Sequence, residues 1–230
     1  MSRPRGQGEA SPLDPDILTA IAGSRDATAR LMVSLDKLDD SLAGRPSLLP
    51  GWSVGHVVTH LARNADSHTR MLSAAMHGDA VEQYAGGGQE RAGNIEAGSG
   101  RSAEVLLDDM RRSIRELEAA WAAMTPEAWE GHGLSRGRRW PCRLMPYFRW
   151  REVEIHHVDM GTGYEPGHWP EEYVRRELAA LLATVPGRLG EASQRRRLLG
   201  WLTGRSPSPG QLDLARWESH RGNYFKGVAD

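Results

Sequence analysis

Residues 53–76 read SVGHVVTHLARNADSHTRMLSAAM, and their spacing predicts a long amphipathic helix. Ser53 is of a residue type that caps helix N-termini, so we expect the helix to begin there. Val57 and Leu61 lie one turn apart, and His60 shares the face that they define. A histidine on a face that points into a protein core needs a partner for its ring nitrogens, and a metal ion is one such partner.

Three further segments, residues 14–42, 102–124 and 144–161, also predict long helices. Asp14 followed by Pro15 is a typical helix start. The apolar stripes comprise Ile17, Ile21, Leu31, Leu35 and Leu38 in the first segment and Val105, Leu106, Met110, Ile114, Leu117 and Trp121 in the second. Four long helices joined by loops predict a mainly α fold, an antiparallel four-helix bundle.

The segments between and after these helices are less regular. Residues 79–101 are glycine-rich and aperiodic, which predicts a functional or mobile loop, and residues 126–143 leave room for a short strand or hairpin. Residues 170–182 and 193–203 predict two more helices. The expected organisation is a disordered lead-in at residues 1–12, the bundle at 13–165 and a short helical C-terminal appendage at 166–230.

The composition excludes several classes of protein. The 230 residues carry a formal net charge of -1, which disfavours binding to nucleic acid or to an acidic membrane surface. The single cysteine, Cys142, excludes an internal disulfide and a cysteine-rich metal site. No apolar run approaches the roughly 20 residues of a membrane span, and the polar N-terminus is no signal peptide. We therefore expect a cytoplasmic protein, whose oligomeric state stays open.

The residues that carry chemistry are concentrated at residues 149–159, which read RWREVEIHHVD. On a helix, Glu152, His156 and Asp159 share a face, and a glutamate and a histidine one turn apart can bind one metal ion. A third ligand must come from another helix, and His60 is our choice. The alternative for Glu152 and His156 is a weak ion pair on a solvated face.

Other polar residues near these positions have open roles. His56 lies one turn before His60 and can supply a fourth ligand, whereas His68, two turns after it, is expected near the mouth of the site. Asp159 can be a ligand or can hold a histidine tautomer. His157 points elsewhere and is expected to be structural.

Three separated blocks resemble the mycothiol-dependent maleylpyruvate isomerases. They are Leu49-Pro50-Gly51-Trp52-Ser53 followed by His60-Leu61-Ala62-Arg63-Asn64-Ala65; Arg91 with Asn94-Ile95-Glu96-Ala97-Gly98; and Arg151-Glu152-Val153-Glu154-Ile155-His156-His157-Val158-Asp159. The blocks occur in the family's order, and the resemblance covers roughly residues 13–170. It implies a DinB-like four-helix bundle.

The resemblance also implies a site and a reaction. His60, Glu152 and His156 match the family's three ligands for a divalent metal, usually zinc, and Arg91 matches an arginine used in catalysis. The partners are a small-molecule substrate and mycothiol, the actinobacterial low-molecular-weight thiol. Its metal-bound thiolate adds to the cis double bond of maleylpyruvate, and rotation followed by loss of the thiol gives fumarylpyruvate. The dianionic substrate suits the Arg91 guanidinium.

Two departures from the family pattern keep other functions open. The short link at residues 186–192 leaves little room for the family's small α/β second domain, and residues 84–90 are glycine-rich where the isomerases have a Pro/Ser-containing segment. One alternative is a mycothiol S-transferase acting on a larger substrate, as in lincosamide-type biosynthesis. A second is a non-catalytic metal- or thiol-binding module, against which Arg91 argues. The resemblance gives Cys142 no role.

Overall fold

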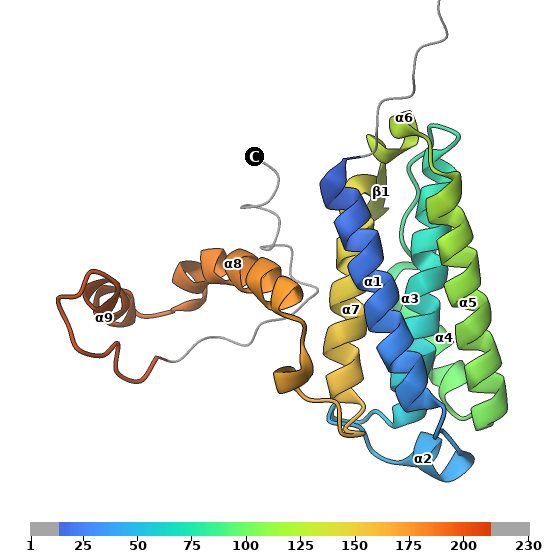
Figure 1. Ribbon diagram of the computed structural model, residues 1–230, viewed down its shortest axis with the longest axis horizontal. Helices are drawn as coiled ribbons and strands as arrows, with labels where there is room; N and C mark the ends of the chain where they lie inside the picture. The colour runs from blue at the N-terminus through green and yellow to red at the C-terminus, as the bar shows by residue number, and fades with distance from the viewer. Residues whose placement is uncertain (1–13, 213–230) are drawn as a thin grey trace, which may run out of the picture. The chain divides into compact units, whose positions relative to one another are not determined.

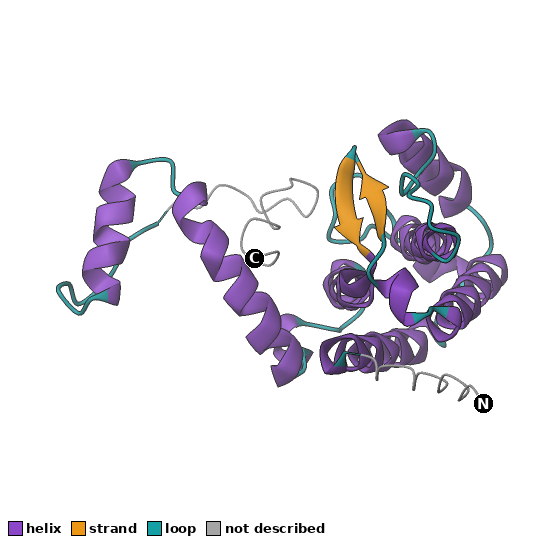
Figure 2. Cartoon of the chain, turned by 90° about the horizontal axis from the view of Figure 1, so that it is seen from above, coloured by secondary structure: helices purple, strands orange, loops and turns teal. Residues whose placement is uncertain are grey.

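Four long helices form the core of the molecule. The computed structural model describes residues 14–212, so the lead-in predicted at residues 1–12 lies outside the described part. The long helices are α1 (Pro15–Leu35), α3 (Val54–Ala75), α5 (Ala103–Ala123) and α7 (Met145–Asp159). They lie side by side (Figure 1), and Figure 2 shows them in a view from above. The mainly α bundle predicted from the sequence is confirmed.

The direction of the helices is set by one long connection. Helices α1 and α7 pack together and run one way, whereas α3 and α5 pack together and run the other way (Figure 1). The neighbours α3 and α5 are therefore parallel, because residues 76–102 lead the chain back along the bundle before α5 begins. A four-helix bundle with such a crossover connection differs from one built only from short antiparallel turns.

The helix starts follow the capping residues in the sequence. The Asp14 carboxylate accepts a hydrogen bond from the backbone N–H of Asp16 at 2.9 Å and begins α1. Ser53 begins α3: its Oγ accepts from the His56 N–H at 3.3 Å, while His56 Nδ1 accepts from the Ser53 N–H at 3.1 Å. These reciprocal bonds satisfy two N–H groups that the helix itself leaves without partners.

The prediction of one continuous helix over residues 14–42 is wrong. Helix α1 ends at Leu35, and a separate short helix, α2 (Asp40–Gly44), follows. The carboxylate of Asp39 accepts from the Leu42 N–H at 2.7 Å, so this aspartate caps a new helix instead of continuing the old one. Leu38 is buried at the break, which explains why the apolar period continues across it.

The prediction of a loop over residues 79–101 is wrong for the second half of this segment. That half forms helix α4 (Gly87–Ser99), which packs against α3. Its glycines, which argue against a helix by propensity, allow a close approach. A Cβ at Gly98 would lie 2.5 Å from Thr59 Cγ2, and a Cβ at Gly55 would overlap the Ser99 carbonyl oxygen. Tertiary packing therefore stabilises a helix that has no apolar period of its own.

A small hairpin covers one end of the bundle, as residues 126–143 allowed. After α6 (Pro126–Trp129), strands β1 (His132–Ser135) and β2 (Arg138–Pro141) pair antiparallel. The two turn residues, Arg136 and Gly137, have φ of 53° and 73°, as a tight hairpin turn requires. A 3-10 turn, η1 (Cys142–Leu144), leads into α7.

One apolar cluster lies at this hairpin end. It joins the first turns of α1 and α7, the last turns of α3 and α5, and helix α6. Its larger members are Ile17, Ile21, Met71, Leu72, Leu117, Trp121, Trp129 and Met145. Cys142 is fully buried among them, and burial raises the pKa of its thiol to about 11, which suits a packed rather than a reactive cysteine.

The described residues divide into two compact units between His168 and Trp169. The first unit ends with a second 3-10 turn, η2 (Pro166–His168). The second unit contains helices α8 (Glu171–Arg188) and α9 (Ala192–Leu202), and its described residues form no strand, so the helical character predicted for the C-terminal region is confirmed. Helix α8 continues past the predicted end at residue 182 and holds Pro186 within its last turn. Within residues 14–212, no helix is long and apolar enough to cross a membrane.

Candidate metal centre

Three side chains from two helices converge at one point inside the bundle. His60 comes from α3, and Glu152 and His156 come from successive turns of α7. His60 Nε2 lies 3.1 Å from Glu152 Oε2 and 3.0 Å from His156 Nε2, while Glu152 Oε2 and His156 Nε2 are 3.5 Å apart. One potential ligand atom from each residue lies within 4.8 Å of the others. The structure thus brings together the three residues predicted as metal ligands.

Burial and mutual contact shift the proton affinities of these groups. Burial, together with the neighbouring His156, lowers the pKa of His60 to about 3. Burial alone would raise the pKa of Glu152, but hydrogen bonds with His156 and His60 hold it well below its usual value. Burial alone would lower the pKa of His156, but hydrogen bonds to Asp159 and Glu152 raise it to about 9. One carboxylate and two imidazoles in this arrangement form a suitable donor set for a divalent cation.

Asp159 orients one of the histidines. Its Oδ2 lies 2.8 Å from His156 Nδ1, on the opposite side of the ring from the nitrogen that faces His60. A proton on Nδ1 leaves Nε2 as the unprotonated nitrogen, which is the form that binds metals. The backbone oxygen of Asp159 also accepts from the Leu48 N–H at 2.8 Å, so the segment before α3 is attached to the end of α7. Of its two predicted roles, the geometry supports the orienting one.

Arg91 reaches the same site from helix α4. Its Nη2 donates to His60 Nδ1 at 3.2 Å, and its guanidinium lies 5.9 Å from the ring centroid of Trp52. The Trp52 ring also meets the edge of the His60 ring, with centroids 5.7 Å apart. Sequence reasoning did not single out Trp52 by itself, although its position one residue before the helix cap Ser53 placed it near the start of α3.

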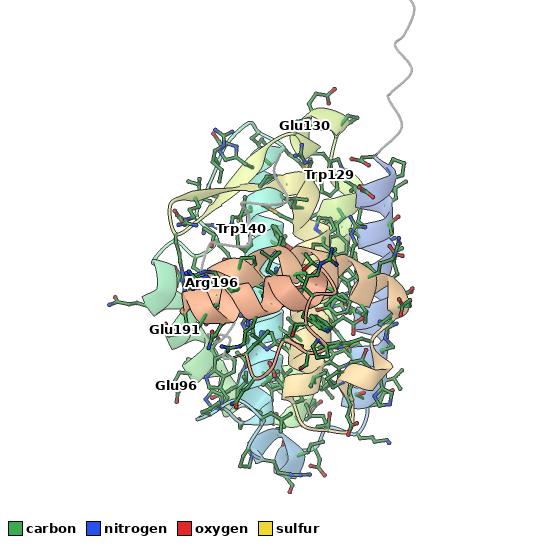
Figure 3. All side chains as sticks on the ribbon, turned by 90° about the vertical axis from the view of Figure 1, so that its left-hand side faces the viewer. Glu96, Trp129, Glu130, Trp140, Glu191 and Arg196 are labelled. Atoms are coloured by element: carbon green, nitrogen blue, oxygen red, sulfur yellow. The ribbon has the colours of Figure 1, made fainter. Side chains whose placement is uncertain are left out.

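The other histidines do not join the group of three. His56 Nδ1 lies 2.8 Å from Ser53 Oγ and its Nε2 lies 3.3 Å from Glu96 Oε2, so both its nitrogens are engaged elsewhere. Figure 3 shows Glu96 toward the α2 end of the bundle and Trp140 nearer the hairpin end. The prediction that His68 lies near the mouth is wrong, because this residue is fully buried, with its ring edge against Trp140.

His157 has the structural position that its place on α7 predicted. Its Nε2 lies 2.8 Å from Ser34 Oγ on α1, and its ring stacks on Tyr164 with centroids 3.8 Å apart. These contacts tie α7 to α1 and to the segment that follows α7. They lie away from the group formed by His60, Glu152 and His156.

The fold and the cluster together define a class: a four-helix-bundle protein with a buried site of two histidines and one carboxylate. Comparison with known families narrows this class. A model described as the mycothiol maleylpyruvate isomerase N-terminal domain matches residues 24–161, and the chain belongs to this family. The resemblance predicted from the three sequence blocks is thereby confirmed.

Two solved structures are similar to the chain over most of its length. A crystal structure of the mycothiol-dependent maleylpyruvate isomerase matches with 29% identity and a TM-score of 0.70, over 76% of this chain and 73% of that one. A structure of that isomerase with a histidine replaced by alanine matches with 28% identity, the same TM-score of 0.70 and the same coverage. A search of functionally curated proteins gave no significant match.

Proposed function

We propose that this chain is a mycothiol-dependent isomerase that converts the cis double bond of maleylpyruvate to trans. The observation that carries the proposal is the convergence of His60, Glu152 and His156 in one buried group on a chain of this family. The two similar crystal structures are described as mycothiol-dependent maleylpyruvate isomerases, which supports an enzymatic rather than a purely structural role.

The three residues fit a divalent cation by their chemistry. They offer two imidazole nitrogens and one carboxylate oxygen, and Asp159 holds His156 in the tautomer that a cation requires. Three protein ligands would leave a coordination position open. When both are bound, the cation would lower the pKa of the mycothiol thiol, whose reversible addition to the cis double bond permits rotation before the thiol leaves. Zinc is the ion that we expect.

Arg91 would hold the anionic substrate. The maleyl group and the pyruvyl group each end in a carboxylate, and a guanidinium is a suitable bidentate partner for either. Arg91 now donates to His60 Nδ1. A His60 that offers Nε2 to a cation carries its proton on Nδ1, so this nitrogen could no longer accept from Arg91. Arg91 would then be available to a substrate carboxylate close to the reacting double bond.

The second candidate is transfer of mycothiol to or from a larger molecule. The observation that favours it is the second unit, whose described residues form the two helices α8 and α9 and no strand. A substrate wider than maleylpyruvate would use the same His60, Glu152 and His156 group and the same thiol. It would differ in lacking a cis double bond that must rotate.

The test is metal analysis followed by turnover. We expect about one divalent ion per wild-type chain and almost none in His60→Ala. As a matched control, His77→Ala removes an exposed histidine just beyond the end of α3 and should retain the ion. Loss of maleylpyruvate absorbance that requires mycothiol would support the isomerase. Metal without such turnover would favour thiol transfer, and absence of metal from the wild type would contradict the proposal.

A further inference from the structure

A second buried polar group adjoins the residues predicted to bind metal. We name it the Arg149 cluster, and it consists of Asn64, Ser67, His68, Tyr84 and Arg149. Arg149 lies one turn before Glu152 on α7, and Asn64 lies one turn after His60 on α3, so the two groups are contiguous along both helices. The cluster is not explained by the predicted metal site, because none of its members belongs to the ligand group.

Arg149 is a buried cation that makes no direct ion pair with a carboxylate among residues 14–212, although the charges of Glu152 and Asp66 act on it. It is only 1% exposed, and its Nη1 donates to the backbone oxygen of Leu61 and to Asn64 Oδ1, both at 2.8 Å and both neutral. Its Nη2 has no hydrogen-bond partner in that range. Burial lowers its pKa to about 10, which still leaves the guanidinium charged at neutral pH. A buried guanidinium that no carboxylate contacts directly is costly, so an anionic ligand would be favourable here.

Two more buried side chains in the cluster have unused hydrogen-bonding capacity. His68 is fully buried, and neither ring nitrogen has a hydrogen-bond partner among the described residues. Burial, together with the charge of Arg149, lowers the pKa of His68 to about 3, so at neutral pH its ring keeps one N–H donor. The Tyr84 hydroxyl is buried close to Ser67 and Arg91, which both act on its pKa, and it makes no hydrogen bond of ordinary geometry to a described residue.

The unused donors identify the chemistry of the missing partner. The guanidinium N–H groups of Arg149, one N–H of His68 and the hydroxyl of Tyr84 can all donate, and the only full charge among them is positive. A carboxylate accepts several hydrogen bonds and matches a guanidinium in charge and shape. Water could satisfy the donors but would not give Arg149 a directly paired negative charge.

We propose that the Arg149 cluster binds one carboxylate of the substrate while Arg91 binds the other. The identity of the ligand rests on the proposed function, but the anion site itself does not. Arg91 donates to His60 Nδ1 at 3.2 Å, and Arg149 donates to the backbone oxygen of the next residue, Leu61, at 2.8 Å, so the two guanidiniums approach the same turn of α3. Two cationic positions beside one reacting centre would select dianions and would fix the position of the double bond between them.

The experiment measures selectivity for a dianion by calorimetric titration of the metal-loaded protein. Maleate carries a cis double bond between two carboxylates, and isocrotonate is the same acid with one carboxylate replaced by methyl. We expect wild type to bind maleate at least about tenfold more tightly than isocrotonate. The ratio of the isocrotonate to the maleate dissociation constant should fall toward one in each of the variants Arg149→Gln, His68→Phe and Tyr84→Phe.

The variants separate a role in binding from a role in folding. Tyr84→Phe removes a hydroxyl that has no partner among the described residues, so the fold should persist even if Arg149→Gln does not fold. His157→Phe replaces another buried histidine, one bonded to Ser34, and should leave the ratio unchanged. A ratio near one in wild type would overturn the inference, as would a wild-type ratio retained in His68→Phe and Tyr84→Phe.

The same measurements distinguish this inference from the proposed function. Thiol-dependent isomerisation with a maleate preference that is insensitive to the three substitutions would contradict the anion site alone. A maleate preference that depends on His68 and Tyr84, in a protein without isomerase activity, would retain the anion site and contradict the isomerase.

Discussion

Both ends of the bundle interior bury apolar side chains, but only the half toward the α2 end places the group of His60, Glu152 and His156 among them. At the hairpin end, residues such as Leu72, Trp121 and Trp129 form an apolar cluster. Toward the α2 end, the same helices bury His60 and His156 beside the partly exposed Glu152. Apolar burial stabilises the fold, whereas burying polar groups costs stability unless partners satisfy them. The hairpin end therefore contributes apolar burial alone, whereas the half toward the α2 end combines apolar burial with the candidate chemistry.

Helix α7 shows a related contrast in two glutamates only two residues apart, of which Glu154 is buried and Glu152 is partly exposed. Glu154 is 1% exposed and receives hydrogen bonds from Arg30 at 2.6 Å, Trp150 at 3.1 Å and Tyr164 at 2.6 Å. Glu152, on another face of the helix, contacts the imidazole nitrogens of His60 and His156. A carboxylate saturated by fixed donors is structural, whereas one facing two histidines can take a cation.

The largest effect should come from replacing each of these two glutamates by glutamine in a separate variant. Glu152→Gln removes a proposed metal ligand, so we expect thiol-dependent isomerase activity to fall at least about a thousandfold with little loss of folding stability. Glu154→Gln should have the opposite effect. The free energy of unfolding should fall by about 1–3 kcal/mol, while the metal content stays at the wild-type level. Urea unfolding and metal analysis of both variants provide the measurement. Equal metal content in the two variants would contradict the distinction between the two carboxylates.

A core truncation tests the apolar end. Leu72 is fully buried in the apolar cluster, and Leu72→Ala should reduce the free energy of unfolding by about 2–5 kcal/mol through lost burial and a residual cavity. Below the unfolding transition, metal content and activity should match the wild type. Leu178→Ala, at an exposed leucine on α8, is the control and should change the stability by less than about 0.5 kcal/mol. Loss of metal from folded Leu72→Ala would show that the two ends are energetically coupled.

The sequence predicted the long helices and the three-residue group well because both depend on local spacing. Apolar residues every three or four positions placed α3 and α5, and the four-residue separation of Glu152 and His156 placed them on one face. The break after Leu35 was missed because the buried Leu38 continues the apolar period across it. Helix α4 was missed because its stability comes from packing against α3 and not from its own composition.

The parts that the sequence could not supply depend on contacts between distant segments. The position of Arg91 beside His60 requires α4 to form and pack, and no local pattern encodes that. His68 was expected near the mouth of the site because spacing fixes the face of a helix but not the depth of a residue in the bundle. Its burial depends on Trp140, which the hairpin brings from 72 positions further along the chain.

The pH dependence of stability should report the buried state of His68. Its folded pKa of about 3 lies below the usual 6.5, so the unfolded chain takes up a proton first as the pH falls. The contribution of the neutral, buried His68 to the free energy of unfolding is fully present above about pH 6.5. It is lost as the pH falls toward 3, at up to about 1.4 kcal/mol per pH unit. His68→Phe should therefore lose less stability than wild type between pH 7 and pH 4 in urea titrations. His77→Ala, at an exposed histidine, should parallel the wild type.

The smallest effect should come from the aromatic contact that positions Arg91. The Trp52 ring lies 5.9 Å from the Arg91 guanidinium, and such a cation–π contact is typically worth about 0.5–2 kcal/mol. Trp52→Leu should raise the KM for maleylpyruvate about three- to tenfold, because Arg91 would be held less firmly for the substrate, while kcat and metal content change little. Trp52→Phe keeps a smaller ring and should recover part of the loss. If Trp52→Leu instead lowered the metal content, the edge contact with His60 would be the interaction that matters, and Trp52 would belong to the candidate metal centre rather than to the substrate site.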